Sequence, residues 1–131
     1  MSQAHRYPLL STPVPAGFPN PASDHMEREI NLNDELVDHP AATFFVRVEG
    51  NSMEGAGIHN GDILIVDKAL DPVSGKIVIA VIEGEFTVKR LIKEQGRTLL
   101  RAENPQIPDR LIKSGDRFEV WGVVTYVIHK C

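Results

Sequence analysis

The sequence predicts a mostly β protein, with a compact, strongly bent β-sheet fold that follows a flexible N-terminal arm. From Thr43 onward, short runs in which apolar and polar residues alternate are separated by turn dipeptides, a pattern typical of half-buried strands. Before Pro40, prolines recur among small and polar residues, a composition that disfavours helices and sheets. With 131 residues, the chain is large enough for one domain with short extensions and too small for two.

The arm is predicted for residues 1–42 and has two parts. The first part should be extended and mobile because prolines interrupt it repeatedly, namely Pro8, Pro13, Pro15, Pro19 and Pro21. In the second part, Asp24 followed by Glu27 at the spacing of a capping box predicts a short helix over residues 26–30. Asn33 predicts a further helical turn toward Val37.

Residues 43–131 are predicted to form a β-rich domain. Its first strand begins at Thr43, carries Val46 and Val48 on its buried face, and leads into the loop that contains Ser52. Further strands are predicted at residues 63–66, 76–82, 85–92, 98–102 and 118–128. The turn dipeptides between them are Asn60-Gly61, Ser74-Gly75, Glu83-Gly84, Gln95-Gly96 and Ser114-Gly115. Short strands at close spacing with little helix indicate a strongly bent sheet or a partial barrel.

Charge and hydropathy exclude several classes of function. The formal net charge is −4, with 14 basic and 18 acidic residues, so no overall basic field attracts DNA or anionic lipid. The longest apolar runs, such as residues 77–82, are much shorter than a membrane span, and the first residues lack the apolar segment of a signal peptide. The only cysteine, Cys131, precludes an intrachain disulfide and suits a reducing compartment. We therefore predict a cytoplasmic protein with no membrane segment and no direct sequence-specific DNA binding.

Two motifs point to a nucleophile and its base. Ser52 lies in Gly50-Asn51-Ser52-Met53, and Lys89 lies in Phe86-Thr87-Val88-Lys89-Arg90-Leu91. A serine hydroxyl becomes a good nucleophile when a base takes its proton, and a lysine amine serves as that base when a desolvated site lowers its pKa. The alternating pattern places Thr87, Lys89 and Leu91 on one strand face, so the amine is expected to point into a partly apolar groove.

The residues alone leave an ordinary structural interpretation open for both side chains. Ser52 would also fit a simple loop serine, and Lys89 would also fit a solvated lysine on a half-exposed strand. No metal site and no cofactor are predicted, because the histidines lack metal-ligand spacing and the chain has no glycine-rich phosphate loop. The histidines are His5, His25, His39, His59 and His129.

A resemblance favours the catalytic interpretation. Seven segments are similar in order and spacing to the LexA/UmuD self-cleaving serine peptidase family, and to its UmuD branch more than to its repressors. They are residues 17–19, 50–53, 57–58, 61–67, 75–80, 84–91 and 122–124. The similarity extends from about residue 15 to about residue 127 and implies a LexA-type peptidase domain.

The resemblance also implies roles for individual residues. Ser52 matches the nucleophile of the family and Lys89 matches its general base, while the backbone N–H groups of Asn51 and Ser52 match its oxyanion donors. Ala16-Gly17 matches the bond that is cut. The position is physically reasonable, because small residues flank the bond within the proline-rich arm and could enter a narrow cleft as an extended chain.

Two function classes stay open at this stage. In the preferred one, the chain is an SOS-response protein that cuts its own Ala16-Gly17 bond after activation by RecA on single-stranded DNA. The family then implies a homodimer whose trimmed form joins a UmuC-type subunit in error-prone translesion synthesis. In the alternative, the protein is a dimeric binding module that keeps the fold without cutting itself. A DNA-binding repressor is not expected, because no basic recognition helix precedes Ser52.

Overall fold

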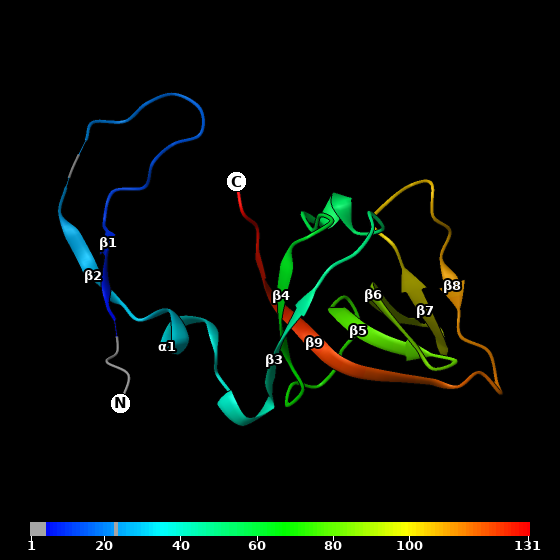
Figure 1. Ribbon diagram of the computed structural model, residues 1–131. Helices are drawn as coiled ribbons and strands as arrows, with labels where there is room; N and C mark the ends of the chain where they lie inside the picture. The colour runs from blue at the N-terminus through cyan, green and yellow to red at the C-terminus, as the bar shows by residue number, and fades with distance from the viewer. Residues whose placement is uncertain (1–4, 23) are drawn as a thin grey trace. The chain divides into compact units, whose positions relative to one another are not determined.

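The computed structural model describes residues 5–22 and 24–131 and divides the chain into two compact units (Figure 1). The first unit ends at Asp38, and the second runs from His39 to Cys131. Part of the arm predicted for residues 1–42, namely residues 1–4 and 23, lies outside the described residues. Among the residues that are described, no helix is both long enough and apolar enough to cross a membrane.

The first unit contains a two-stranded antiparallel sheet of β1 (Tyr7–Leu10) and β2 (Met26–Ile30). The helix predicted over residues 26–30 is therefore wrong, since this segment is a strand. Pairing with β1 satisfies the backbone N–H and C=O groups of this segment, and this tertiary pairing outweighs its local capping pattern. The expectation that the proline-rich part holds no regular element is also wrong at β1. Pro8 fits there because both strands of a two-stranded sheet are edge strands, where a missing N–H is tolerated.

The short helix α1 (Leu32–Leu36) confirms the turn predicted near Asn33. It begins one residue earlier than expected because Asn31 is the capping residue, and its side chain accepts a hydrogen bond from the Asn33 N–H at 3.0 Å. A 2.6 Å ion pair between Arg28 and Glu35 links this helix to β2.

The second unit is a seven-stranded antiparallel sheet with the order β3-β4-β9-β5-β6-β7-β8. Its strands are β3 (Thr43–Arg47), β4 (Ile63–Asp67), β5 (Ile77–Ile82), β6 (Glu85–Glu94), β7 (Arg97–Arg101), β8 (Arg110–Leu111) and β9 (Phe118–Ile128). Two short 3₁₀ turns, η1 (Pro40–Ala42) and η2 (Glu54–Ala56), flank β3 and the loop after it. The prediction of a mostly β fold is confirmed, and all six strands expected after Thr43 are present. Only β8 was not expected.

The sheet bends along β9, the long strand that crosses the second unit in Figure 1. The C-terminal half of β9 pairs with β4 and its N-terminal half pairs with β5, so β9 joins two parts of the sheet that point in different directions. Gly122 lies at this junction. A Cβ atom there would come within 2.5 Å of Cγ1 of Val66, so glycine is required for β4 to pass this closely.

Both faces of β5 are buried, as its continuous apolar sequence predicts. Ile79 packs into one core cluster with Val48, Met53, Ile58, Leu64 and Val66. Val78, Ala80 and Ile82 pack into a second cluster with Leu91, Leu100 and Val123. The first cluster supports the loop after β3, and the second supports β6. These are the two elements that carry Ser52 and Lys89.

Candidate active site

The loop after β3 holds Ser52 at the rim of a cleft. Gly50 has a φ of +95°, a conformation that glycine adopts without strain, and its N–H donates to Oδ1 of Asn60 at 2.8 Å. The next residue after the serine, Met53, is almost fully buried in the first core cluster. The loop is therefore anchored on both sides of Ser52, while Ser52 itself stays partly exposed.

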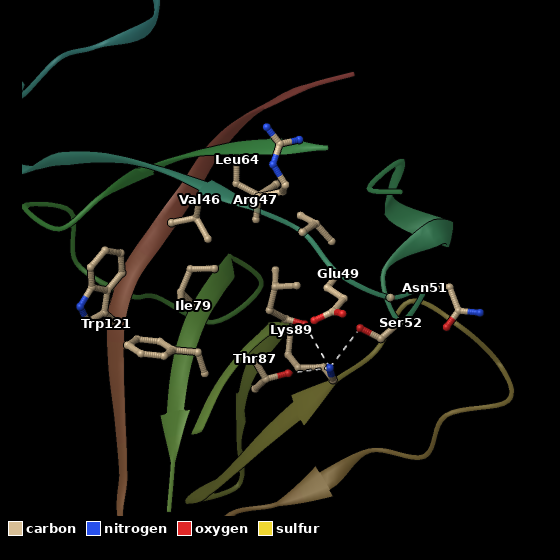
Figure 2. A pocket seen from close by; sticks show the side chains of 14 residues that line it. Val46, Arg47, Glu49, Asn51, Ser52, Leu64, Ile79, Thr87, Lys89 and Trp121 are labelled. Carbon is tan, nitrogen blue, oxygen red and sulfur yellow. Dashed lines mark hydrogen bonds between the residues drawn. The ribbon is translucent and has the colours of Figure 1, made fainter. Parts of the chain in front are cut away.

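Lys89 reaches the same point from β6. Its Nζ lies 3.1 Å from Oγ of Ser52, 2.9 Å from Oγ1 of Thr87 and 3.2 Å from the carbonyl oxygen of Val88, as the dashed lines in Figure 2 show. The three acceptors match the three N–H bonds of an ammonium group. After loss of one proton, two N–H bonds remain for Thr87 and Val88, and the lone pair faces the Ser52 hydroxyl.

Burial lowers the pKa of the Lys89 amine below the ordinary value for lysine. The cause is desolvation, which penalises the charged form, and no carboxylate forms an ion pair with this amine among the described residues. The neutral amine is the form that accepts a proton. The environment of Lys89 thus favours the state that a general base requires.

Thr87 contacts the Lys89 amine, and the sequence did not predict this contact. Alternation along β6 places it on the same face as Lys89, and the structure adds a direct hydrogen bond from the amine to Oγ1. The alternating pattern of β6 shows that Thr87 and Lys89 share a face. It does not specify the side-chain torsions that bring the amine within hydrogen-bond distance of the hydroxyl.

The cleft beside Ser52 has a volume of about 620 Å³ and lies between β3 and β6. Its lining changes along its length (Figure 2). Near Ser52 and Lys89 it is polar, whereas Val46, Ile79 and Trp121 make the other end apolar. A groove with a reactive polar end and an apolar end suits an extended peptide better than a small polar molecule.

Asn51 and Ser52, the predicted oxyanion donors, lie at the polar end of this cleft. Within the described part of the chain, neither backbone N–H group donates a hydrogen bond to another residue. Both donors are therefore available to a group in the cleft.

The predicted cleavage site lies in the first unit, in the loop between β1 and β2. Ala16 and Gly17 are both exposed, and a Cβ atom on Gly17 would meet nothing within 4 Å. The neighbouring side chains of Val14 and Phe18 are 89% and 93% exposed. The bond is thus in an open loop, as a protease substrate requires. The structure brings together Ser52, Lys89 and Asn51, which all belong to the second unit.

Comparison with known proteins identifies the family of the chain. The family model described as Peptidase S24-like matches residues 8–125, a range that includes Ala16, Gly17, Ser52 and Lys89. SamA of Salmonella typhimurium is 48% identical over 123 residues, which cover 94% of this chain and 85% of SamA. MucA of Escherichia coli is 44% identical over 126 residues, with 95% and 86% covered. The LexA repressor of Psychromonas ingrahamii is 38% identical over 122 residues, which cover 92% of this chain and 57% of the repressor. The chain therefore belongs to the Peptidase S24-like family, the LexA/UmuD family of serine peptidases.

Proposed function

We propose that the protein is a Ser-Lys autoprotease that cuts its own Ala16-Gly17 bond, with Ser52 as nucleophile and Lys89 as general base. The observation that carries this proposal is the 3.1 Å contact between Nζ of Lys89 and Oγ of Ser52. A base must lie within hydrogen-bond reach of the proton that it removes, and this contact meets that requirement. The lowered pKa of Lys89 and the adjoining peptide-sized cleft support the same reaction.

The reaction has two stages. Neutral Lys89 takes the hydroxyl proton of Ser52 as Oγ attacks the carbonyl carbon of Ala16, and the N–H groups of Asn51 and Ser52 stabilise the negative charge on the carbonyl oxygen. The protonated Lys89 then gives its proton to the leaving nitrogen of Gly17, which leaves an ester between Ala16 and Ser52. In the second stage, Lys89 takes a proton from a water molecule that attacks the ester carbonyl carbon, and it gives this proton to Oγ of Ser52 as the ester bond breaks. The products are residues 1–16 and a trimmed chain of residues 17–131.

The biological setting that we propose follows from the family. RecA bound to single-stranded DNA acts as the activator by stabilising the cleavable arrangement of the chain. The protein works as a homodimer, and its trimmed form is an accessory subunit that binds a UmuC-type polymerase during translesion synthesis in the SOS response. An arrangement that is rarely populated without the activator would keep the precursor intact until DNA is damaged.

Intact mass measurement tests the proposal directly. Purified wild type and Ser52→Ala are incubated at about pH 7 and about pH 10, the second value being near the ordinary pKa of lysine. Loss of residues 1–16 by the wild type alone supports self-cleavage at Ala16-Gly17. If the wild type stays whole at both pH values, the incubation is repeated with RecA, single-stranded DNA and nucleotide. An uncut chain under those conditions would favour the non-cleaving binding module.

The rate of cleavage is expected to rise with pH and then to level off. Because burial lowers the pKa of Lys89, the neutral base becomes populated at a lower pH than in a solvated lysine. The pH at which the rate is half-maximal should therefore lie below 10.5. The measurement is the first-order rate of cleavage at closely spaced pH values. A rate that falls between about pH 7 and about pH 10, or a half-maximal rate that is reached only above pH 10.5, would contradict a buried lysine base.

Thr87→Val is expected to slow cleavage about 10-fold while the protein stays folded. Valine keeps the shape of threonine and removes the oxygen that accepts a hydrogen bond from Nζ of Lys89. The amine then loses one of the two contacts that hold its lone pair toward Ser52. Thr98→Val, on the neighbouring strand β7 and away from the cleft, is the matched control and should cleave at the wild-type rate.

A further inference from the structure

A segment outside the predicted motifs supports the loop that carries Ser52. This segment, residues 102–104, follows β7 and makes two backbone hydrogen bonds to the loop. The N–H of Glu103 donates to the carbonyl oxygen of Ser52 at 2.8 Å, and the N–H of Gly55 donates to the carbonyl oxygen of Glu103 at 2.8 Å. The contact is close, because a Cβ atom on Gly55 would lie 2.7 Å from that same carbonyl oxygen.

The segment is also attached to the strand that carries the base. Nε of Arg90 lies 2.5 Å from Oε1 of Glu103, and Nη1 of the same arginine donates to the carbonyl oxygen of Gly75 at 2.6 Å. Both side chains of the ion pair are largely shielded from solvent. Arg90 directly follows Lys89 along β6. The segment therefore connects the element that supplies the nucleophile to the element that supplies the base.

Asn104 makes a contact that bears on the chemistry itself. Its Nδ2 donates to the carbonyl oxygen of Asn51 at 3.1 Å, while its Oδ1 accepts the N–H of Gln106 at 3.0 Å. The second bond closes a turn of its own loop, so the amide is held at both ends. The first bond reaches a carbonyl in the Ser52 loop, which is far away in the sequence.

The carbonyl of Asn51 and the N–H of Ser52 belong to the same peptide group. A peptide group is planar and, in its trans form, its C=O and N–H bonds point in opposite directions. Fixing the carbonyl oxygen of Asn51 therefore also fixes the direction of the Ser52 N–H. The N–H of Glu54 also donates to this carbonyl oxygen at 3.4 Å, so Asn104 supplies the shorter of the two hydrogen bonds that hold this peptide plane.

We propose that Asn104 is a positioning residue for the oxyanion hole, which acts by holding the Asn51-Ser52 peptide so that the Ser52 N–H points at the carbonyl oxygen under attack. This inference rests on the proposed function, because it assigns a task within the self-cleavage reaction. In the described part of the chain, Asn104 does not line the cleft and forms no hydrogen bond with Lys89. Its effect is on the stabilisation of charge in the transition state and not on the supply of the base.

The variant Asn104→Asp tests whether Asn104 positions the Ser52 N–H or only supports the fold of its own loop. Aspartate keeps the oxygen that accepts the Gln106 N–H, and it loses only the donor to the carbonyl of Asn51. Asn104→Ser is a second, uncharged variant that keeps a turn-forming oxygen and is too short to reach Asn51. Gln106→Glu is the control for added charge, since it places a carboxylate in the same exposed loop while leaving the Asn104 contact in place.

The readout is the rate of self-cleavage against pH, under conditions in which the wild type cleaves, together with thermal unfolding. We expect Asn104→Asp and Asn104→Ser to lower the plateau rate about 10-fold or more, with the midpoint of the pH profile unchanged for the uncharged Asn104→Ser. Gln106→Glu should cleave at the wild-type rate. Plateau rates within about twofold of the wild type for either folded Asn104 variant, or a shifted midpoint for Asn104→Ser, would overturn the inference.

The same assay separates a failure of this inference from a failure of the proposed function. If Ser52→Ala is inert and the Asn104 variants cleave normally, the autoprotease assignment holds and only the role of Asn104 is wrong. If Ser52→Ala is cut at the wild-type rate, the proposed function itself is wrong, and the role of Asn104 is rejected with it.

Discussion

Replacing Ser52 with alanine is expected to abolish self-cleavage and to leave the fold intact. The variant loses the hydroxyl oxygen that lies 3.1 Å from Nζ of Lys89 and that forms the ester with Ala16 in the proposed reaction. Loss of a catalytic nucleophile typically costs at least about 10³-fold in rate. The measurement is the fraction of chain cut after prolonged incubation, with RecA on single-stranded DNA present.

The stability of this variant should stay close to that of the wild type. Ser52 is partly exposed and its side chain fills no core position, so the free energy of unfolding should change by about 1 kcal/mol or less. Ser114→Ala, in an exposed turn away from the cleft, is the matched control and should cleave normally. Processing of Ser52→Ala at the normal site and rate would rule out Ser52 as the nucleophile.

Replacing Lys89 is expected to have an effect of similar size, because no other described side chain supplies an amine at the Ser52 hydroxyl. Lys89→Ala should slow cleavage by about 10³-fold or more, in the range of a lost general base. Lys89→Arg is the sharper variant. Arginine keeps the length and the positive charge, but its guanidinium does not lose a proton at any pH that a protein tolerates, so it should be as inactive as alanine.

Lys93→Ala is the matched control for these variants. It removes a lysine from the same strand, β6, but Lys93 is exposed and its amine contacts the carbonyl oxygen of Pro72 instead of Ser52. Cleavage of Lys93→Ala should equal that of the wild type. If Lys89→Arg cleaved at the wild-type rate, a base other than residue 89 would have to activate Ser52.

The pKa of Lys89 also links protonation to stability. Because burial lowers this pKa in the folded state, the unfolded chain binds the proton more readily. The free energy of unfolding should therefore rise as the pH increases from the lowered pKa toward the ordinary pKa of lysine. Lys89→Ala removes this contribution, so the stability of the wild type relative to the variant should increase across the same window. Urea unfolding at several pH values measures the difference.

Strand prediction succeeded in the second unit because local pattern and tertiary structure agree there. The hairpin between β5 and β6 is the clearest example. Glu83 and Gly84 have φ values of +50° and +79°, the conformation of a tight two-residue turn, and the flanking residues pair in register from Ile82 with Glu85 to Ile77 with Arg90. Apolar runs and turn residues encode such a hairpin locally.

Prediction failed where the backbone partners lie far apart in the sequence. The Asp24 and Glu27 pattern favours a helix over residues 26–30, yet pairing with Tyr7–Leu10 makes this segment a strand. β8 has only two residues, Arg110–Leu111, and it exists because Leu99 and Leu100 on β7 offer a free edge. Neither pairing leaves a periodic signal in its own segment.

The sequence by itself determined the family and the mostly β architecture, because these depend on local periodicity, turn residues and short motifs. The resemblance to that family then predicted the candidate nucleophile, base and cleavage site. Only the tertiary structure decided how the site is assembled. The bend at Gly122, the 3.1 Å contact between Ser52 and Lys89, and the bonds from Glu103 and Asn104 to the Ser52 loop all join residues from separate strands and loops. Such contacts depend on the path of the whole sheet and on side-chain torsions, neither of which a local pattern specifies.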